Sequence, residues 1–391
     1  MARYDLLIIN RSFWPIYPVI GESLLRLAEK LAPKKKVAIV MQDHVGIKKE
    51  LQKNNRGIGV KFFPSWAIST SSSNILIRVL DAIFFMFWVT ICLIITRPKD
   101  IYVSTDPPVI VPFVVAVYSK IFKSRFIYHI QDIHPEATNI VIKLNSIIYK
   151  LFKKIDIFTI KQADLLITLT NQMKNVIINR ANTKKNIFII ENPSVPFEQD
   201  LSSMKKNIGF SFTGNLGRLQ RIPLLLNAIK IYSENGGKLN FYFAGAGIYA
   251  ESILKNSKIN SLINYKGVLS PEDSVLLSSK YEWAILPIED DVLNYAFPSK
   301  TSSYVFSGAK ILAICGESTN VANWIKNNKL GFVVPPKISQ LVDFFFKIEK
   351  QKIDLDKLNL DRKELKKRLH INLFIKNLNS VIYSANDDKT I

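Results

Sequence analysis

Hydrophobic and polar residues alternate along this chain in blocks that predict strands and helices in turn. Short apolar runs, such as LLII after Asp5 and ILAI after Lys310, are typical of strands buried on both faces of a parallel sheet. Segments with apolar residues every three or four positions, as at 22–31 and 222–232, predict amphipathic helices between such runs. Repeated βα units of this kind predict an α/β fold with parallel, doubly wound sheets.

Two successive sets of these units are separated by a charged, proline-containing stretch at 192–206. The expected strands are 4–10, 35–42, 59–64, 100–105, 125–130, 163–170 and 186–192 in the first set, and 207–213, 238–245, 263–267, 281–288 and 309–315 in the second. The pattern predicts two Rossmann-like lobes, 1–194 and 195–365, with a last helical segment, 366–391, that crosses back to the first lobe. Ligands of such folds bind beyond the carboxyl ends of the strands, so we expect a site in a cleft between the lobes.

The segment 74–97 is more apolar than a surface helix requires, because AIFFMFWVTICLIIT at 82–96 carries no charge. Spanning a bilayer takes about 20 apolar residues. Three interpretations stay open: a buried helix of the first lobe, a helix lying in the membrane interface, and a true span. Lysines at 34–36, 48–49, 120 and 123, with Arg125, would add attraction to anionic lipid if they share that face. If these cations do not share that face, they are ordinary solvated surface residues.

The formal net charge of +21 implies an anionic partner, which is nucleic acid, anionic lipid or a phosphorylated substrate. Nucleic acid is not expected, because the chain has neither an aromatic and basic RNA motif nor helix-turn-helix spacing. Cys92 and Cys315 lie in apolar runs, and the four histidines are scattered, so neither a disulfide scaffold nor a metal site is expected. The first residues, MARYDLLIIN, have the pattern of a first strand and not that of a signal peptide, which predicts a cytoplasmic protein.

The stretch TGNLGRLQRIP at 213–223 lies between an expected strand and an expected helix. Gly214 and Gly217 allow the backbone to approach a ligand closely, and the helix start favours a phosphate. Arg218 and Arg221 suit a diphosphate, because a guanidinium group binds phosphate oxygens in pairs. The alternative is a tight turn with two surface arginines.

A second stretch, NYAFPSKTSSYVFSGAKILAI at 294–314, predicts a helix that opens at Pro298 and Ser299 and ends at Gly308. Lys300 lies in its first turn, where the helix dipole disfavours a cation unless an anion is bound. The alternative is a lysine that is there by chance.

A third stretch, YHIQDIHPEAT at 128–138, places Gln131, Asp132, His134 and Glu136 at the carboxyl end of a buried strand. Such crowding of polar groups is typical of a site. The alternative is that Asp132 caps the next helix and that the loop is simply solvated.

Taken together, these stretches resemble the family-4 retaining glycosyltransferases of GT-B fold. The similarity is to the branch that builds O-antigen and capsule chains, and to its fucosamine-transferase-like members in particular. The matching segments run in the family's order over nearly the whole chain: YVSTDPPVIVP, QDIHPEA, ADLLITLT, ENPSV, FTGNLGRLQ, FAGAG, KGVLSPED, WAILPI, PSKTSSYVFSGAKILAI and GFVVPP.

The resemblance implies a role for each candidate residue. The implied donor-binding set is Gly214, Asn215, Gly217, Arg218, Arg221, Gly245, Gly247, Pro287, Pro298, Ser299, Lys300 and Ser303. Within that set the arginines and Lys300 would bind the diphosphate, and the 245–247 loop and Pro287 would flank the nucleobase. Gly21 and Glu136 would belong to acceptor loops. Asp132, His134, Arg218 and Lys300 would carry catalysis.

The chain departs from the family pattern at Ser303, where the family usually has a glutamate that binds the ribose hydroxyls. The earlier glutamate of the paired motif is also absent, with Tyr295 near its place, so Glu317 is an alternative ribose ligand. The implied mechanism retains configuration and uses no metal and no cofactor beyond the nucleotide-sugar substrate. In this mechanism the leaving phosphate accepts the acceptor's proton, and catalysis is positioning and charge stabilisation.

The expected function is therefore transfer of a sugar, such as an N-acetylated amino sugar, from a nucleotide sugar to a lipid-linked glycan in surface polysaccharide synthesis. A UDP-sugar is the favoured donor, although no motif fixes the base. The expected location is peripheral, at an anionic membrane surface on the cytoplasmic side. The alternatives are a membrane-associated binding protein whose site has decayed, as Ser303 allows, and a nucleotide-sugar epimerase of the same fold.

Overall fold

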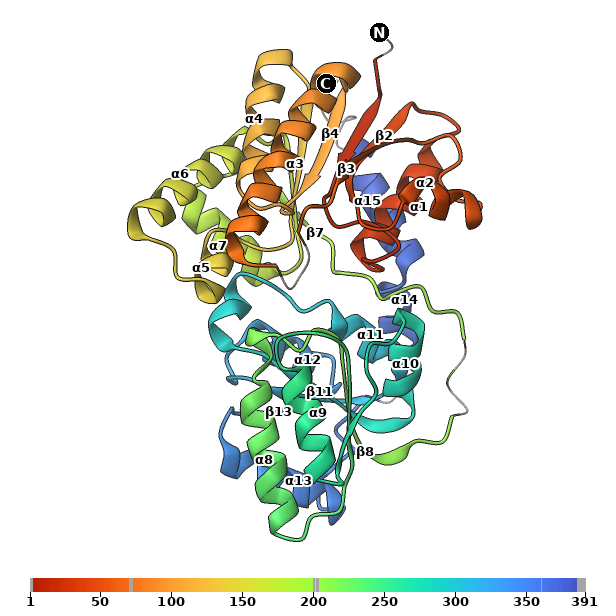
Figure 1. Ribbon diagram of the computed structural model, residues 1–391, viewed down its shortest axis with the longest axis vertical. Helices are drawn as coiled ribbons and strands as arrows, with labels where there is room; N and C mark the ends of the chain where they lie inside the picture. Colours follow the sequence, from red (N-terminus) through yellow and green to blue (C-terminus); the bar gives the residue numbers. More distant parts are fainter. Residues whose placement is uncertain (1–2, 70–72, 200, 202–203, 360, 385–391) are drawn as a thin grey trace. The chain divides into compact units, whose positions relative to one another are not determined.

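The computed structural model describes residues 3–69, 73–199, 201, 204–359 and 361–384 (Figure 1). The chain forms two compact units, one of Met1–Pro193 with Ile371–Ile391 and one of Ser194–His370. Each unit is built on its own parallel sheet, as the alternation of apolar runs and amphipathic segments predicts.

The first unit contains a seven-stranded sheet in the order β3-β2-β1-β4-β5-β6-β7. Its strands are β1 (Leu6–Ile9), β2 (Val37–Asp43), β3 (Lys61–Trp66), β4 (Asp100–Ser104), β5 (Arg125–Ile130), β6 (Leu165–Thr168) and β7 (Ile187–Ile189). All neighbouring strands pair in parallel, with β1 between β2 and β4. The central strands β1 and β5 are buried along nearly their whole length and are mostly apolar, as expected for strands of a parallel sheet that is covered on both faces.

The helices of this unit are α1 (Ile20–Leu31), α2 (Ile47–Lys53), α3 (Ile75–Thr96), α4 (Ile110–Phe122), α5 (Glu136–Val141), α6 (Ser146–Gln162), α7 (Asn171–Ala181) and α15 (Ile371–Ser384). α15 packs against α1, and its Phe374 and Leu378 join the same apolar core as Leu24. The segment expected to cross back was 366–391. In the structure the part that belongs to the first unit begins at Ile371, and residues 385–391 lie outside the described range.

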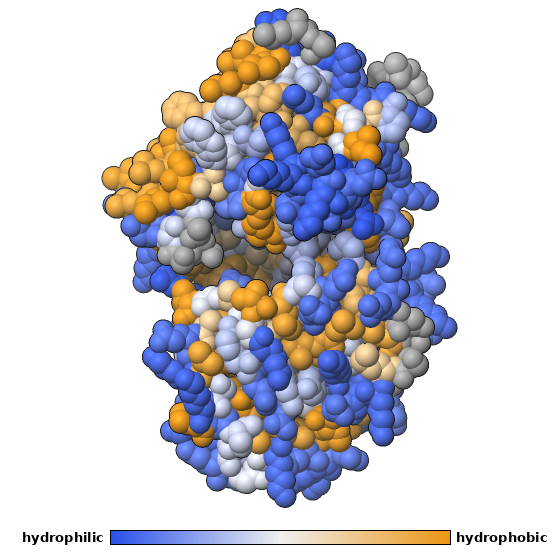
Figure 2. Space-filling view, turned by 45° about the vertical axis from the view of Figure 1, so that its right-hand side comes forward, coloured by the Kyte–Doolittle hydropathy of each residue, from blue (hydrophilic) through white to orange (hydrophobic). Residues whose placement is uncertain are grey.

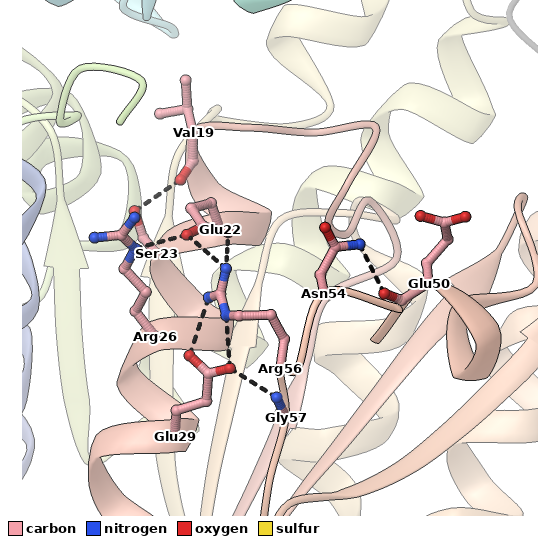
Figure 3. A network of polar contacts seen from close by, with 9 residues as sticks. All are labelled: Val19, Glu22, Ser23, Arg26, Glu29, Glu50, Asn54, Arg56 and Gly57. Atoms are coloured by element: carbon pink, nitrogen blue, oxygen red, sulfur yellow. Dashed lines mark hydrogen bonds and ion pairs between the residues drawn. The ribbon is translucent and has the colours of Figure 1, made fainter. Parts of the chain in front are cut away.

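A network of ion pairs ties α1 to the loop before β3 (Figure 3). Glu22 is buried and accepts a hydrogen bond of 2.6 Å from Arg26, one turn further along the helix. Arg56 bonds to both Glu22 and Glu29, at 3.2 Å and 2.8 Å, and Glu29 also accepts from the Gly57 amide. Because both carboxylates are paired, the loop is fixed to the surface of α1.

The second unit contains a six-stranded parallel sheet in the order β10-β9-β8-β11-β12-β13. Its strands are β8 (Asn207–Thr213), β9 (Phe241–Ala244), β10 (Ile263–Tyr265), β11 (Tyr281–Pro287), β12 (Lys310–Ile314) and β13 (Gly331–Val334). The helices are η1 (Arg218–Gln220), α8 (Ile222–Glu234), α9 (Ala250–Ile259), α10 (Pro271–Ser279), η2 (Asp290–Asn294), α11 (Lys300–Ser307), α12 (Asn320–Asn327), α13 (Ile338–Glu349) and α14 (Lys363–Arg368). Its core is aromatic, with Phe210 stacked on Phe241 and both rings against Phe345.

Candidate active site

Two glycine loops lie side by side at the carboxyl edge of the second sheet, after β8 and after β9. The Gly214 amide donates to the Ala244 carbonyl at 2.9 Å, and the Leu216 amide donates to the Ala246 carbonyl at 2.8 Å. A Cβ atom at Gly245 would lie 1.8 Å from the Gly214 carbonyl oxygen, and one at Gly247 would lie 2.5 Å from that of Leu216. Only glycine therefore lets the two loops approach this closely, at φ of +136° and +148°.

Lys300 lies directly beneath the first of these loops. A Cβ atom added to Gly214 would be 3.3 Å from the Lys300 Nζ, and the same Nζ lies 4.1 Å from the centre of the Phe212 ring. The side chain is half-buried, but its Nζ is shielded from solvent, and no hydrogen-bond acceptor among the described residues reaches it. Burial lowers the pKa of Lys300 to about 7. A shielded amino group without an acceptor would be stabilised in its charged form by an anion bound beside the glycine loop.

The helix that carries Lys300 begins and ends as the sequence predicts. Ser299 is the N-cap of α11 without a side-chain capping bond, and Thr301 donates its hydroxyl to the Pro298 carbonyl at 2.8 Å. Gly308 ends the helix at φ 69°. One residue that the sequence did not single out is Tyr304, which donates its hydroxyl to the Ile285 carbonyl at 3.1 Å and accepts from the Thr213 amide at 3.4 Å. Tyr304 thus fixes α11 to the ends of β8 and β11.

The two arginines of the glycine stretch lie in different environments. Arg218 starts η1, and its exposed side chain has no ion pair with any carboxylate that the structure describes. Arg221 donates to the Ile288 carbonyl at 2.8 Å and pairs with Glu289 and Asp290 at 3.0 Å and 3.1 Å. Arg218 is therefore available to a ligand. The guanidinium group of Arg221 is already engaged by other groups of the protein.

Glu289 and Asp290 follow β11 and connect three segments of the carboxyl edge. The Glu289 amide donates to the Leu219 carbonyl at 2.9 Å, and Asp290 accepts from the Gly316 amide at 2.8 Å. Burial and the neighbouring carboxylates raise the pKa of Glu289, although Arg221 opposes the shift. Sequence spacing gave no signal for these acids, because their partner Arg221 lies 68 positions before Glu289.

The other donor candidates are distributed around the same edge. Asn215 is exposed and its Nδ2 lies 2.8 Å from where a Cβ of Gly217 would be, while Pro287 is the last residue of β11. Ser303 is half-buried in the first turn of α11. Glu317, the alternative ribose ligand, is exposed and pairs with Lys326 at 3.3 Å. No group of three His, Cys, Asp or Glu side chains in the described ranges is placed to hold a metal ion.

In the first unit, Asp132 and His134 follow β5 at the carboxyl edge of its sheet. The Asp132 amide donates to the Thr105 hydroxyl at 3.2 Å, but its half-buried carboxylate accepts no hydrogen bond from the residues that the structure describes. Burial, with the neighbouring Asp106 carboxylate, raises the pKa of Asp132 to about 6. Burial lowers the pKa of His134 to about 4, so its ring is neutral at pH 7, and its Nδ1 lies 2.7 Å from the Thr138 hydroxyl.

The alternative role for Asp132, capping of the next helix, does not match the structure. The N-cap of α5 is Pro135, without any side-chain capping bond. A carboxylate that neither caps nor pairs is free to accept a hydrogen bond from a ligand hydroxyl.

Glu136 and Gly21, expected in acceptor loops, both make close contacts inside the first unit. Glu136 is buried and pairs with Arg180 at 2.5 Å and with Lys153 at 3.4 Å, and Arg180 also pairs with Asp156. A Cβ atom at Gly21 would lie 2.5 Å from the Trp14 backbone nitrogen. The contacts assign Glu136 to an internal ion-pair cluster and Gly21 to close packing of α1 on the preceding loop.

Comparison with known proteins supports one class of enzyme. No protein-family model matches the chain. It is 25% identical over 296 residues to the probable glycosyltransferase WbjE of Pseudomonas aeruginosa, which is 70% of this chain and 73% of that protein. Solved structures of the lipopolysaccharide outer core galactosyltransferase WaaB and of WaaG, a glycosyltransferase involved in lipopolysaccharide biosynthesis, superpose with TM-scores of 0.64 and 0.65. WaaB shares 16% sequence identity with this chain and WaaG shares 11%. Each match covers 97% of this chain and 99% of the other one.

The chain has the GT-B fold. The relative and the fold together support a glycosyltransferase of this type. The structure of a Listeria monocytogenes protein that is proposed to be a UDP-N-acetylglucosamine 2-epimerase superposes equally well, with a TM-score of 0.63 and 10% identity. The match covers 99% of this chain and 98% of that one. The GT-B fold alone therefore does not separate transfer from epimerisation.

The contacts of Arg221 predict a structural effect in this GT-B chain. Arg221→Ala should lower the free energy of unfolding by about 1–3 kcal/mol, because it removes charge-assisted hydrogen bonds to Ile288, Glu289 and Asp290. Arg221 also has a left-handed φ of 43°, so Arg221→Gly should be more stable than Arg221→Ala by about 1 kcal/mol. Urea unfolding of the three proteins measures both differences. Unchanged midpoints in both variants would show that the ion pairs contribute nothing.

Proposed function

We propose that this protein is a glycosyltransferase that moves a sugar from a nucleotide sugar to a lipid-linked glycan acceptor in surface polysaccharide synthesis. The observation that carries the proposal is the Lys300 Nζ, shielded from solvent and without an acceptor, beside Gly214 at the carboxyl edge of the second sheet. A nucleotide sugar offers a diphosphate to such a site. WbjE is described as a probable glycosyltransferase, and the link of WaaB and WaaG to lipopolysaccharide favours a surface polysaccharide product.

The finer proposal is retention of configuration without a metal ion, in a family-4, fucosamine-transferase-like enzyme. Lys300 and Arg218 stabilise the negative charge that develops on the leaving diphosphate, and that phosphate accepts the proton of the acceptor hydroxyl. Arg221 stabilises the glycine loop indirectly, through its ion pairs with Glu289 and Asp290. The sugar is a UDP-linked one, such as an N-acetylated amino sugar.

Ribose binding is the weakest contact in this proposal. Ser303 supplies one hydroxyl where a carboxylate would accept two hydrogen bonds from the ribose diol. Glu289 and Asp290, the acidic side chains that follow β11, are already paired with Arg221. We therefore expect the base and ribose to contribute less to affinity than the diphosphate.

Thermal-shift measurements with UDP-, GDP- and dTDP-sugars test donor binding. A ligand at 100 times its Kd stabilises the bound unit by about 2.7 kcal/mol, which raises the melting temperature by roughly 5–10 °C for a unit of this size. The Lys300→Met variant is the control, since it keeps the side-chain stem but loses the charge. No shift with any nucleotide sugar would contradict the proposal.

A transfer assay then separates the proposed enzyme from its two alternatives. Formation of a longer lipid-linked glycan with release of the nucleoside diphosphate is the expected result. Conversion of the nucleotide sugar to its epimer in the absence of acceptor would instead assign the protein to the epimerases that share its fold. Binding without either reaction would indicate a site that has decayed, as Ser303 allows.

A further inference from the structure

α3 has apolar residues on two opposite faces, whereas a helix that covers a sheet normally has a polar outer face. Its inner face is fully buried and includes Phe85, Val89 and Leu93. Its outer face carries a row of exposed apolar side chains spaced by three or four residues, which are Leu76, Leu80, Ile83, Phe87, Ile91 and Ile94. From Leu76 to Ile94 this row is about 27 Å long.

The inner face keeps α3 inside the fold. By length and composition alone Leu76–Thr96 is able to cross a membrane. However, the fully buried Asp81 accepts hydrogen bonds from Gln42 at 2.7 Å and from the Ser69 hydroxyl at 2.5 Å. Moving α3 into a bilayer would break these bonds and uncover the sheet beneath it. Only the outer row is therefore available to a partner.

Neighbouring elements extend the apolar surface beyond α3. α4 packs beside α3 and ends in the exposed Ile121 and Phe122, and α6 packs beside α4 and exposes Ile147 and Leu151 in its first turns. Trp66, 79% exposed at the end of β3, stacks on Phe84 of α3. In Figure 2 hydrophobic side chains gather on this flank of the first unit. A surface of this extent on a folded unit is typical of an interaction site.

The exposed charged side chains on α3, α4 and α6 are all positive. From residue 73 to residue 163 no acidic side chain is exposed, because Asp81, Glu136 and Asp156 are buried and the remaining acids are half-buried; the first exposed acid beyond this range is Asp164. The exposed cations in the same range are Arg78, Arg97, Lys99, Lys120, Lys123, Lys143, Lys150, Lys154 and Lys161. The partner should therefore combine an apolar interior with anionic groups at its surface.

An anionic lipid bilayer has this combination. The apolar row would lie at the boundary between head groups and acyl chains, and the long lysine side chains would reach the lipid phosphates. A second copy of this chain fits less well, because a two-fold interface through the same face would bring these cations against each other. We propose that α3, α4 and α6 form a membrane-docking surface that binds anionic bilayers while α3 stays packed in the first unit.

Vesicle flotation of the full chain tests this surface without reference to the transfer reaction. The protein should float with vesicles of phosphatidylglycerol and phosphatidylcholine, and bind weakly to phosphatidylcholine alone. Leu80→Lys and Phe87→Lys replace side chains that are 62% and 60% exposed, so the fold should persist while the bound fraction falls at least tenfold. The matched control is Ile259→Lys, which changes an 83% exposed isoleucine of the second unit and should bind like the wild type.

The contribution of the lysine charges to vesicle binding is measured with Lys150→Glu and Lys154→Glu. The control is Lys258→Glu in the second unit. Each lysine near an anionic surface contributes about fivefold to partitioning, so each α6 variant should lose at least this much and the control should not. Raising the salt concentration should weaken the binding of the wild type, because the Debye length falls from about 10 Å at 0.1 M to about 3 Å at 1 M.

Trp66 provides a second readout. It is the one exposed tryptophan of the five, all of which lie in the described part of the chain, so its fluorescence should shift to the blue when anionic vesicles are added. The shift should be lost in Trp66→Phe. A wild type that ignores anionic vesicles would overturn the proposal. So would a dimer that dissociates in Phe87→Lys without any vesicle binding, since the surface would then join two copies.

Discussion

Replacing Lys300 with methionine is expected to weaken binding of the nucleotide sugar by about 10- to 150-fold and to lower kcat/KM by at least as much. The reason is the loss of one charge-assisted contact to the diphosphate, which contributes about 1.5–3 kcal/mol. Methionine removes the amino group that lies over the Phe212 ring but keeps a long apolar side chain of similar volume. Calorimetric titration with the donor measures the affinity, and initial rates measure the transfer.

The same variant should fold at least as stably as the wild type. The Lys300 Nζ is shielded without an acceptor among the described residues, which costs free energy in the unliganded protein. Since burial lowers the pKa of Lys300 to about 7 and the unfolded chain keeps a value near 10.5, the unfolded state binds more protons between these limits. Stability of the unliganded wild type should therefore rise with pH from about 7, and this rise should be absent in Lys300→Met.

Donor affinity should change in the opposite direction. A diphosphate binds the protonated form of Lys300, so affinity should be greatest below pH 7 and fall as the pH rises further, by at most tenfold for each unit. The Kd of Lys300→Met should not show this decline. Equal donor affinity in the variant and the wild type at pH 6.5 would show that Lys300 does not contact the ligand.

Much of the fold could be predicted because apolar runs indicate the strands and because residues such as glycine indicate where elements end. β8 and β12 lie where the apolar runs predict them, and Gly308 ends α11 as its backbone freedom allows. The order of the strands could not be predicted, because which strands pair depends on crossovers between distant segments. The pattern of α3 left three interpretations open for a related reason: both of its faces are apolar, so periodicity did not show which one faces the sheet.

The candidate site was predictable where a residue's role depends on its own segment, and not where it depends on a distant partner. Lys300 stands out in sequence because a cation opens its helix, and the structure places it under Gly214. Arg221 looks like Arg218 in sequence, yet its guanidinium is held by Glu289 and Asp290. Glu136 looked like a loop residue, but Arg180, which lies 44 positions further along the chain, draws it into a buried ion pair.

The second large effect is expected at Asp132, where substitution with asparagine should abolish transfer and leave the donor Kd within a few-fold of the wild type. The Asp132 carboxylate accepts no hydrogen bond from the described residues and is free to accept one from a sugar hydroxyl. Asparagine keeps the size of the side chain but loses the charge, and the neutral His134 beside it supplies no replacement. Rates at saturating donor, compared with donor titrations, separate loss of turnover from loss of binding.

The pH dependence of Asp132 gives an independent check, because activity and stability should move in opposite directions. Burial raises the pKa of Asp132 to about 6, so the ionised form that accepts the hydrogen bond, and with it the activity, should appear as the pH rises through 6. The folded protein binds more protons than the unfolded chain between about pH 4 and 6, so this carboxyl makes folding less favourable as it ionises. Asp132→Asn removes that cost, and its melting temperature at pH 7 should equal or exceed that of the wild type. A residue that only supported the loop would show the reverse, a lower melting temperature with nearly normal turnover, and that result would rule out a role for Asp132 in transfer.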